Sequence, residues 1–194
     1  NANFIETAKR FSPALLIEFL ELTGPVHAKL LSDLDPFAKA VFSVAWAGEN
    51  ESYNWFHVAR EYTEKYHHQL QIREAVGKTE ALMTAEFYAP FMQTFFFVLP
   101  YLLTNHPAPN EDVVVLEVGG SNGAICYLQY KNGQWQILQD WGSIDLYAKT
   151  VIPADIAWKL FTKGVSPMEI MPLVTLEGNP ILAAQMLNLI AVVA

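Results

Sequence analysis

The residues best suited to chemistry lie between Trp55 and Lys78, in the string WFHVAREYTEKYHHQLQIREAVGK. This string holds three of the five histidines and two of the three arginines of the chain. Glu64 and His68 are four residues apart, so on a helix they lie one turn apart on the same side. A carboxylate and an imidazole at this spacing can bind the same metal ion. The pair predicts two ligands of a metal site, with a third from another helix and an open position for water or substrate.

Other readings of the same residues stay open at this point. A Glu-x-x-x-His pair on a helix is also a common surface ion pair, and Glu64 has a second candidate partner in Arg60, one turn back. His67 lies three residues after Glu64, the spacing of carboxylate-bridged di-iron bundles. That type of site needs a second Glu-x-x-His motif, which the chain lacks. We therefore set the di-iron reading aside.

One long helix is expected to position these residues. An apolar stripe at helical spacing predicts its buried side: Trp55, Val58, Ala59, Tyr62, Tyr66, Leu70 and Val76. A second, polar stripe runs beside it: His57, Glu61, Glu64 and His68. Ser52 or Asn54 is expected to cap the start of the helix, and Gly77 its end.

The string resembles the signature helix of the maleylpyruvate isomerase N-terminal domain family, within the DinB-like superfamily of thiol-dependent metalloenzymes. Four other segments are similar to the same group, so that the resemblance spans nearly the whole chain: NANFIETAKRFSPALLIEFLELTGP, FSVAWAGE, DIAWKLFTKG and LNLIAVVA. It points to a group of proteins and not to one reaction.

The resemblance implies a divalent metal, zinc above all, held by Glu64 and His68. It also implies a third ligand, a histidine from an opening helix, which we expect upstream of Asn1. A low-molecular-weight thiol would bind the metal as a thiolate and act as a nucleophile. Arg60 and Arg73 are candidates for binding an anionic substrate or cofactor, and Arg60 is equally a candidate for supporting Glu64. The half after residue 111 contains no arginine, which argues against maleylpyruvate itself as substrate.

Composition excludes several classes of protein. The chain of 194 residues has a net charge of -8 and only three arginines, so a phosphate-binding basic patch for nucleic acid is not expected. No apolar run approaches the roughly 20 residues that span a bilayer. The single cysteine, Cys126, excludes an intramolecular disulfide and fits a reducing cytoplasm.

The N-terminal half is predicted to be helical. We expect a short helix over residues 2–10 with Phe4, Ile5 and Ala8 inward. Helices over 13–23 and 26–34 follow, separated by a break at Gly24-Pro25. Residues 41–48 are expected to form a packed loop. The aromatic segment after Thr79 predicts a helix that packs on the central one, with Phe91, Phe95, Phe96 and Phe97 as core or, alternatively, as the wall of a pocket.

The turn-rich segment 104–112 predicts a boundary between a helical DinB-like domain, residues 1–108, and a C-terminal domain, residues 111–194. Beyond it, alternating apolar residues predict strands at VVVLEV, AICYLQY, WQILQD, LYAKTVI and LVTLEG, with a hairpin turn at Asn132-Gly133. Helices are expected from Pro153, near Pro167 and from Pro180 to Ala191. The fold class is therefore α+β, a helical bundle followed by a small antiparallel sheet with helices that resembles sterol-carrier-like folds.

Three functions fit these expectations. The first is a metal- and thiol-dependent transferase or isomerase acting on a small molecule. The second is a non-catalytic protein that binds an apolar small molecule. The third is a structural protein that forms a homodimer through its helices.

Overall fold

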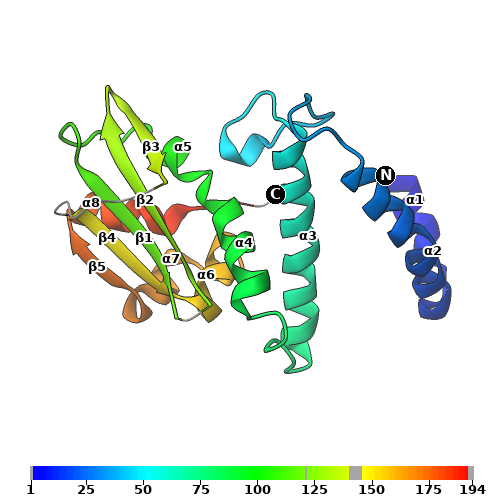
Figure 1. Cartoon of the computed structure of the whole chain (residues 1–194). Coiled ribbons are helices and arrows are strands. Elements are labelled where there is room, and N and C mark those ends of the chain that lie inside the picture. The colour runs from blue at the N-terminus through cyan, green and yellow to red at the C-terminus, as the bar shows by residue number, and fades with distance from the viewer. Residues whose placement is uncertain (1, 121, 140–145, 192–194) are drawn as a thin grey trace.

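The computed structural model describes residues 2–120, 122–139 and 146–191, with a helical first half followed by a half that contains both strands and helices (Figure 1). The helices of the first half are α1 (Ala2–Ala8), α2 (Pro13–Ser32), α3 (Asn54–Ala75), α4 (Ala85–Phe96) and α5 (Leu99–Leu102), with a short 3-10 helix at Ala45–Ala47. The strands are β1 (Val113–Gly119), β2 (Ala124–Lys131), β3 (Gln134–Leu138), β4 (Leu146–Pro153) and β5 (Thr175–Gly178). The predicted α+β class is confirmed.

The central helix α3 forms where the sequence predicts it. Tyr66 and Leu70 of the predicted stripe are buried, but Trp55 and Val76 are exposed. The helix ends as expected at Gly77, whose φ of 66° suits the left-handed position after a helix. The predicted N-cap is wrong, because the capping position is Tyr53 and no side chain caps the helix there. Instead, the Asn54 side chain donates to the backbone oxygen of Asp35, 2.9 Å away.

Helix α4 packs against α3 and supplies the centre of the core. Phe91 and Phe95 are fully buried, and their ring centroids lie 4.5 Å apart. Phe96 is also buried, while Phe97 is exposed. The core reading is thereby confirmed for Phe91, Phe95 and Phe96 and is wrong for Phe97. Pro90 lies inside the helix without ending it.

The sheet has the strand order β3-β2-β1-β4-β5. β1 pairs with β4 in parallel and the other neighbours are antiparallel, so the expected purely antiparallel sheet is wrong. Asn132 and Gly133 both have positive φ, as a tight hairpin turn between β2 and β3 requires. On β1, alternate residues Val114, Leu116 and Val118 join the main core.

The remaining helices pack on the sheet and on α4. They are α6 (Ala154–Phe161), α7 (Pro167–Ile170) and α8 (Pro180–Gln185), with 3-10 turns at Met171–Leu173 and Met186–Asn188. The last helix is thus shorter than the expected 180–191. The Tyr88 hydroxyl on α4 donates to the backbone oxygen of Ala154, and Lys159 on α6 pairs with Glu74 on α3. A single buried cluster runs from Tyr66 to Ala191 and joins the helical half to the sheet.

Helices α1 and α2 form an arm that stands off from the rest of the molecule (Figure 1). The expected break at Gly24-Pro25 is wrong, since α2 runs through it to Ser32. Pro25 removes one backbone donor, and the carbonyl of Glu21 that loses this partner lies on an exposed helix. The expected inward packing of Phe4 and Ile5 is also wrong. Both are exposed, and neither α1 nor α2 contains a buried residue.

Two further features bear on the sequence predictions. The loop 41–48 is packed only in part, because Val44 is fully buried while Val41 and Phe42 are exposed. Among the helices of the described residues, none has the combined length and apolar character needed to cross a membrane.

Candidate functional site

Helix α3 brings the two predicted metal ligands together. Nε2 of His68 lies 3.8 Å from Oε2 of Glu64, as the spacing of four residues predicts. His68 is the more exposed of the two, and its Nδ1 lies 3.0 Å from the amide oxygen of Gln71. The second predicted partner of Glu64 is not found: Arg60 bonds to Glu61 instead.

His67, three residues after Glu64, lies in the same cluster. One ligand atom each from Glu64, His67 and His68 lies within 4.8 Å of the others. His67 is 7% exposed, and neither of its ring nitrogens has a hydrogen-bond partner among the described residues. Burial lowers the pKa of His67, and the neighbouring His68 lowers it further. The imidazole is therefore held neutral, the form that binds a metal.

Arg60 organises a second polar group one to two turns earlier on α3. Its Nη2 lies 2.8 Å from Nδ1 of His57 and 3.1 Å from Oε1 of Glu61. Since a guanidinium only donates, Nδ1 of His57 must accept, which places the His57 proton on Nε2. Burial lowers the pKa of His57, with Arg60 as the next cause, so this neutral form is favoured.

Arg73, the other predicted anion-binding residue, lies far from Arg60. Thirteen residues of helix separate the two, or about 20 Å at 1.5 Å per residue. Nε of Arg73 is buried and finds no hydrogen-bond partner in the described part of the chain. Arg60 and Arg73 therefore do not converge on one small molecule.

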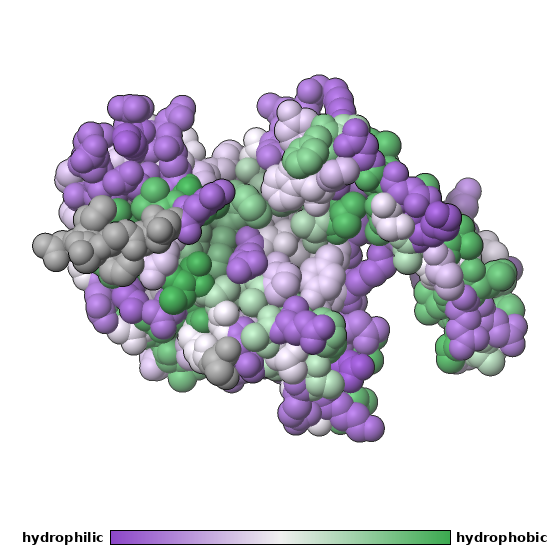
Figure 2. Space-filling view, viewed as in Figure 1, coloured by the Kyte–Doolittle hydropathy of each residue, from purple (hydrophilic) through white to green (hydrophobic). Residues whose placement is uncertain are grey.

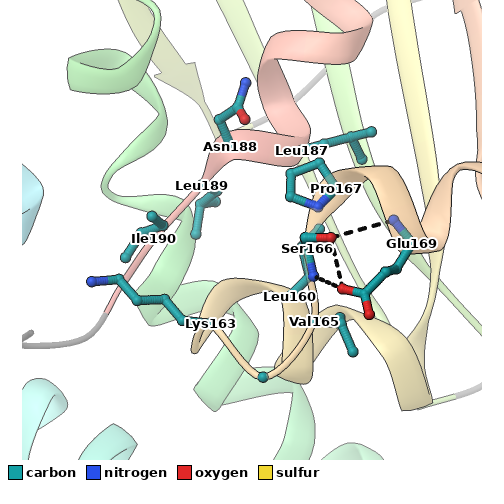
Figure 3. A pocket seen from close by; sticks show the side chains of 11 residues that line it. Leu160, Lys163, Val165, Ser166, Pro167, Glu169, Leu187, Asn188, Leu189 and Ile190 are labelled. Carbon is teal, nitrogen blue, oxygen red and sulfur yellow. Dashed lines mark hydrogen bonds between the residues drawn. The ribbon is translucent and has the colours of Figure 1, made fainter.

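Sequence reasoning missed a cavity in the C-terminal half, drawn in Figure 3. Its volume is about 400 Å³, and it lies between the end of α6, the start of α7 and the segment after α8. Six of its lining residues are apolar: Leu160, Val165, Pro167, Leu187, Leu189 and Ile190. Segments about 25 residues apart in the chain form it, so local periodicity carries no signal for it.

The polar residues of this cavity differ in how free they are to bind a ligand. Ser166 and Glu169 satisfy each other in a capping box at the start of α7, with the Ser166 backbone N–H 2.7 Å from Oε2 of Glu169 (Figure 3). Lys163 makes no ion pair within the described ranges. Its side chain extends away from the Ser166–Glu169 pair in Figure 3.

Lys163 also has an unusual backbone conformation. Helix α6 ends in a Schellman motif, in which the N–H of Gly164 bonds to the Lys159 oxygen and the N–H of Lys163 to the Leu160 oxygen. This motif places Lys163 at the left-handed position, with φ of 62°, where glycine is usual. The sequence does contain a glycine here, but one residue later. A lysine is thus kept at the strained position beside the cavity.

Cys126 is not a candidate nucleophile. It is buried on β2, and burial raises the pKa of its thiol to about 12. Since the thiolate is the reactive form, the thiol is inert near neutral pH.

Comparisons with known proteins give similarity to solved structures only. No family model matches the chain, and no curated protein matches it. The structure of a UbiJ-SCP2 ubiquinone synthesis protein is 17% identical, with a TM-score of 0.33, over 52% of this chain and 96% of that one. The apo form of sterol carrier protein 2 from Yarrowia lipolytica is 16% identical, with a TM-score of 0.35, over 53% of this chain and 89% of that one.

Proposed function

We propose that this protein binds an apolar small molecule in the cavity between α6, α7 and the segment after α8. The observation that carries the proposal is the cavity itself: about 400 Å³ in volume, with six apolar lining residues. Cavities that bind small molecules have volumes of roughly 300–1,000 Å³ and are lined mainly by apolar side chains with few polar groups. Lys163 supplies one such polar group, so a ligand with an anionic end fits best.

The experiment is a titration with 11-(dansylamino)undecanoate, whose fluorescence rises when the dansyl group leaves water. Val165→Trp places a larger side chain in the cavity and is expected to weaken binding at least tenfold. Ile125→Trp, on the exposed side of β2, is the matched control and should bind as the unmodified protein does. Equal affinity of the Val165→Trp variant and the unmodified protein would exclude this cavity as the site.

A second candidate function rests on a separate observation: the ring of His67 is buried beside Glu64 and His68, and its two nitrogens have no hydrogen-bond partner among the residues that the structure describes. We propose that these three residues hold a divalent metal ion, with zinc the best match to two imidazoles and one carboxylate. A bound zinc ion would supply Lewis acidity and lower the pKa of a coordinated thiol or water. This proposal keeps the metal- and thiol-dependent transferase or isomerase reading, in which Glu64, His67 and His68 bind and orient.

A further inference from the structure

The end of α2, the loop after it and the first half of α3 line a second, half-open cavity of about 380 Å³. The arm approaches the body of the molecule here and stands off elsewhere (Figure 2). The junction is fixed by the Asn54 side chain, which donates to the Asp35 oxygen, and by the Trp55 N–H, which donates to the Pro36 oxygen. The cavity therefore lies where the arm is anchored.

Two kinds of side chain line this cavity. One wall is apolar and comes from the end of α2 and the loop after it: Leu30, Leu31, Leu34, Val41 and Phe42. The polar wall consists of Asn54, His57, Arg60 and Glu61 of α3, together with His27 of α2. A ligand that fills this space must therefore combine an apolar body with a polar end.

The polar wall offers donors more than acceptors. Within the described part of the chain, Arg60 uses only Nη2 for its side-chain hydrogen bonds, to His57 and Glu61, so Nη1 and Nε remain as donors. His57 accepts through Nδ1 and keeps its proton on Nε2 as another donor. His27 has the same arrangement, because its Nδ1 faces Nζ of Lys65 at 3.4 Å.

The charges favour an anion. Glu61 is the only carboxylate among the lining residues, and it already faces two cations, Arg60 at 3.1 Å and Lys65 at 3.7 Å. Lys65 does not line the cavity, but together with Arg60 and Glu61 it forms a group of three charged residues with one positive charge in excess, in a chain whose net charge is -8. Arg60 is only 14% exposed, so solvent screens its charge weakly.

We propose that this cavity binds a small apolar carboxylate, with the carboxylate on Arg60 and His57 and the apolar body against Leu34 and Phe42. Arg60 suits this role because its planar guanidinium presents paired donors to a carboxylate. Glu61 holds the guanidinium in place and competes weakly for it. The site is separate from the cavity that Lys163 lines.

The test uses a charged and a neutral probe of the same shape, 4-fluorobenzoate and 4-fluorobenzamide, followed by fluorine NMR titration of the full chain. We expect the benzoate to bind and the benzamide to bind at least tenfold more weakly. Arg60→Ala should weaken benzoate binding by about tenfold to a hundredfold, the range for a lost charge-assisted hydrogen bond. Leu34→Trp, which fills the cavity with Arg60 intact, should also weaken it.

Two further variants distinguish binding at Arg60 from a structural role of that residue and from binding in the cavity beside Lys163. Glu61→Gln removes the competing carboxylate and should tighten benzoate binding about threefold, an effect that a purely structural role for Arg60 would not produce. Any benzoate bound in the other cavity would be weakened in Lys163→Ala, whereas the binding that Arg60→Ala removes should persist in that variant. Equal affinity for the two probes, or unchanged affinity in Arg60→Ala, would overturn the proposal. A loss in Lys163→Ala with none in Leu34→Trp would overturn it as well, by moving the site to the other cavity.

Discussion

The rings of His67 and His68 stack on α3, with centroids 5.0 Å apart and planes inclined by 26°. Adjacent residues on a helix usually point about 100° apart. Here the two side chains bend toward each other, and His67 remains buried beside Trp158, 6.3 Å away between ring centroids. The arrangement places an unpartnered imidazole within reach of Glu64 and His68.

The metal proposal predicts that all three residues contribute to zinc affinity. Zinc titration in competition with a chromophoric chelator, at fixed pH, should show affinity lost in His68→Ala and in Glu64→Gln. His67→Ala should weaken binding at least tenfold, because a third ligand is removed. His106→Ala, in the loop before β1, is the control. Unchanged affinity in His67→Ala would remove His67 from the site, and unchanged affinity in all three would end the metal proposal.

His67 also predicts a pH dependence of stability without metal. Its pKa is lowered in the folded state, so below about pH 6.5 the unfolded chain binds more protons than the folded one. The free energy of unfolding should therefore fall as pH drops from 6.5, until the folded pKa is passed. In urea titrations, His67→Leu should flatten this slope. It should also raise stability at pH 7 by about 1 kcal/mol, because a buried group without hydrogen bonds is removed.

A loss of stability in the His67→Leu variant at pH 7 would contradict this reading of His67 as an unpartnered group. A slope as steep as that of the unmodified protein would assign the pH dependence to another residue.

Because the arm is exposed, we expect its backbone amides to be less protected from hydrogen exchange than those of the buried helices. Helix α2 has no buried residue, and most of the stability of helices in proteins comes from the packing of an apolar face. Its amides should exchange with solvent much faster than those of α4, whose Phe91, Met92 and Phe95 are fully buried. Hydrogen exchange read by mass spectrometry checks this. Protection of α2 equal to that of α4, rising with protein concentration, would instead show that a second copy covers the arm.

Features that depend on local sequence pattern could be predicted from the sequence, and features that depend on packing between distant segments could not. The alternation of apolar residues around Val114 and the turn at Asn132-Gly133 are local patterns. The strands and the hairpin that they predict are therefore present in the structure. The parallel pairing of β1 with β4 joins segments about 30 residues apart, and nothing in either strand specifies it. The inward packing expected for Phe4 and Ile5 of α1 failed because apolar spacing indicates a helix but not whether a partner covers it.

The same distinction between local pattern and distant packing applies to the candidate site on α3. Glu64 and His68 share a turn of α3, so their spacing alone brought them together. His67 is buried beside Trp158, about 90 residues later, and this burial could not be read from the string around it. The pairing of Arg60 with His57 and Glu61 depends on side-chain conformations that spacing leaves open.

Burial of Cys126 predicts an unreactive thiol. Its pKa is raised to about 12, so almost none of it is thiolate at pH 8. With a chromogenic disulfide reagent, the folded protein should react far more slowly than the same protein in denaturant. Equal rates would mean that β2 opens readily or that the thiol is accessible in the fold.

The strained backbone of Lys163 should lower the stability of the protein, while its ammonium group should favour ligand binding. Two variants can separate these two effects. Its left-handed backbone, φ of 62°, costs about 1 kcal/mol for a residue other than glycine. Lys163→Gly should therefore raise the free energy of unfolding by about 1 kcal/mol, whereas Lys163→Ala, which cannot relieve the strain, should leave it nearly unchanged. Both variants remove the same ammonium group from the cavity, so both should weaken binding of 11-(dansylamino)undecanoate to a similar extent. Urea unfolding and fluorescence titration of the pair read the two effects independently. Full affinity in both variants would show that the strained lysine does not serve the ligand, and equal stability of the two would show that the strain is not there.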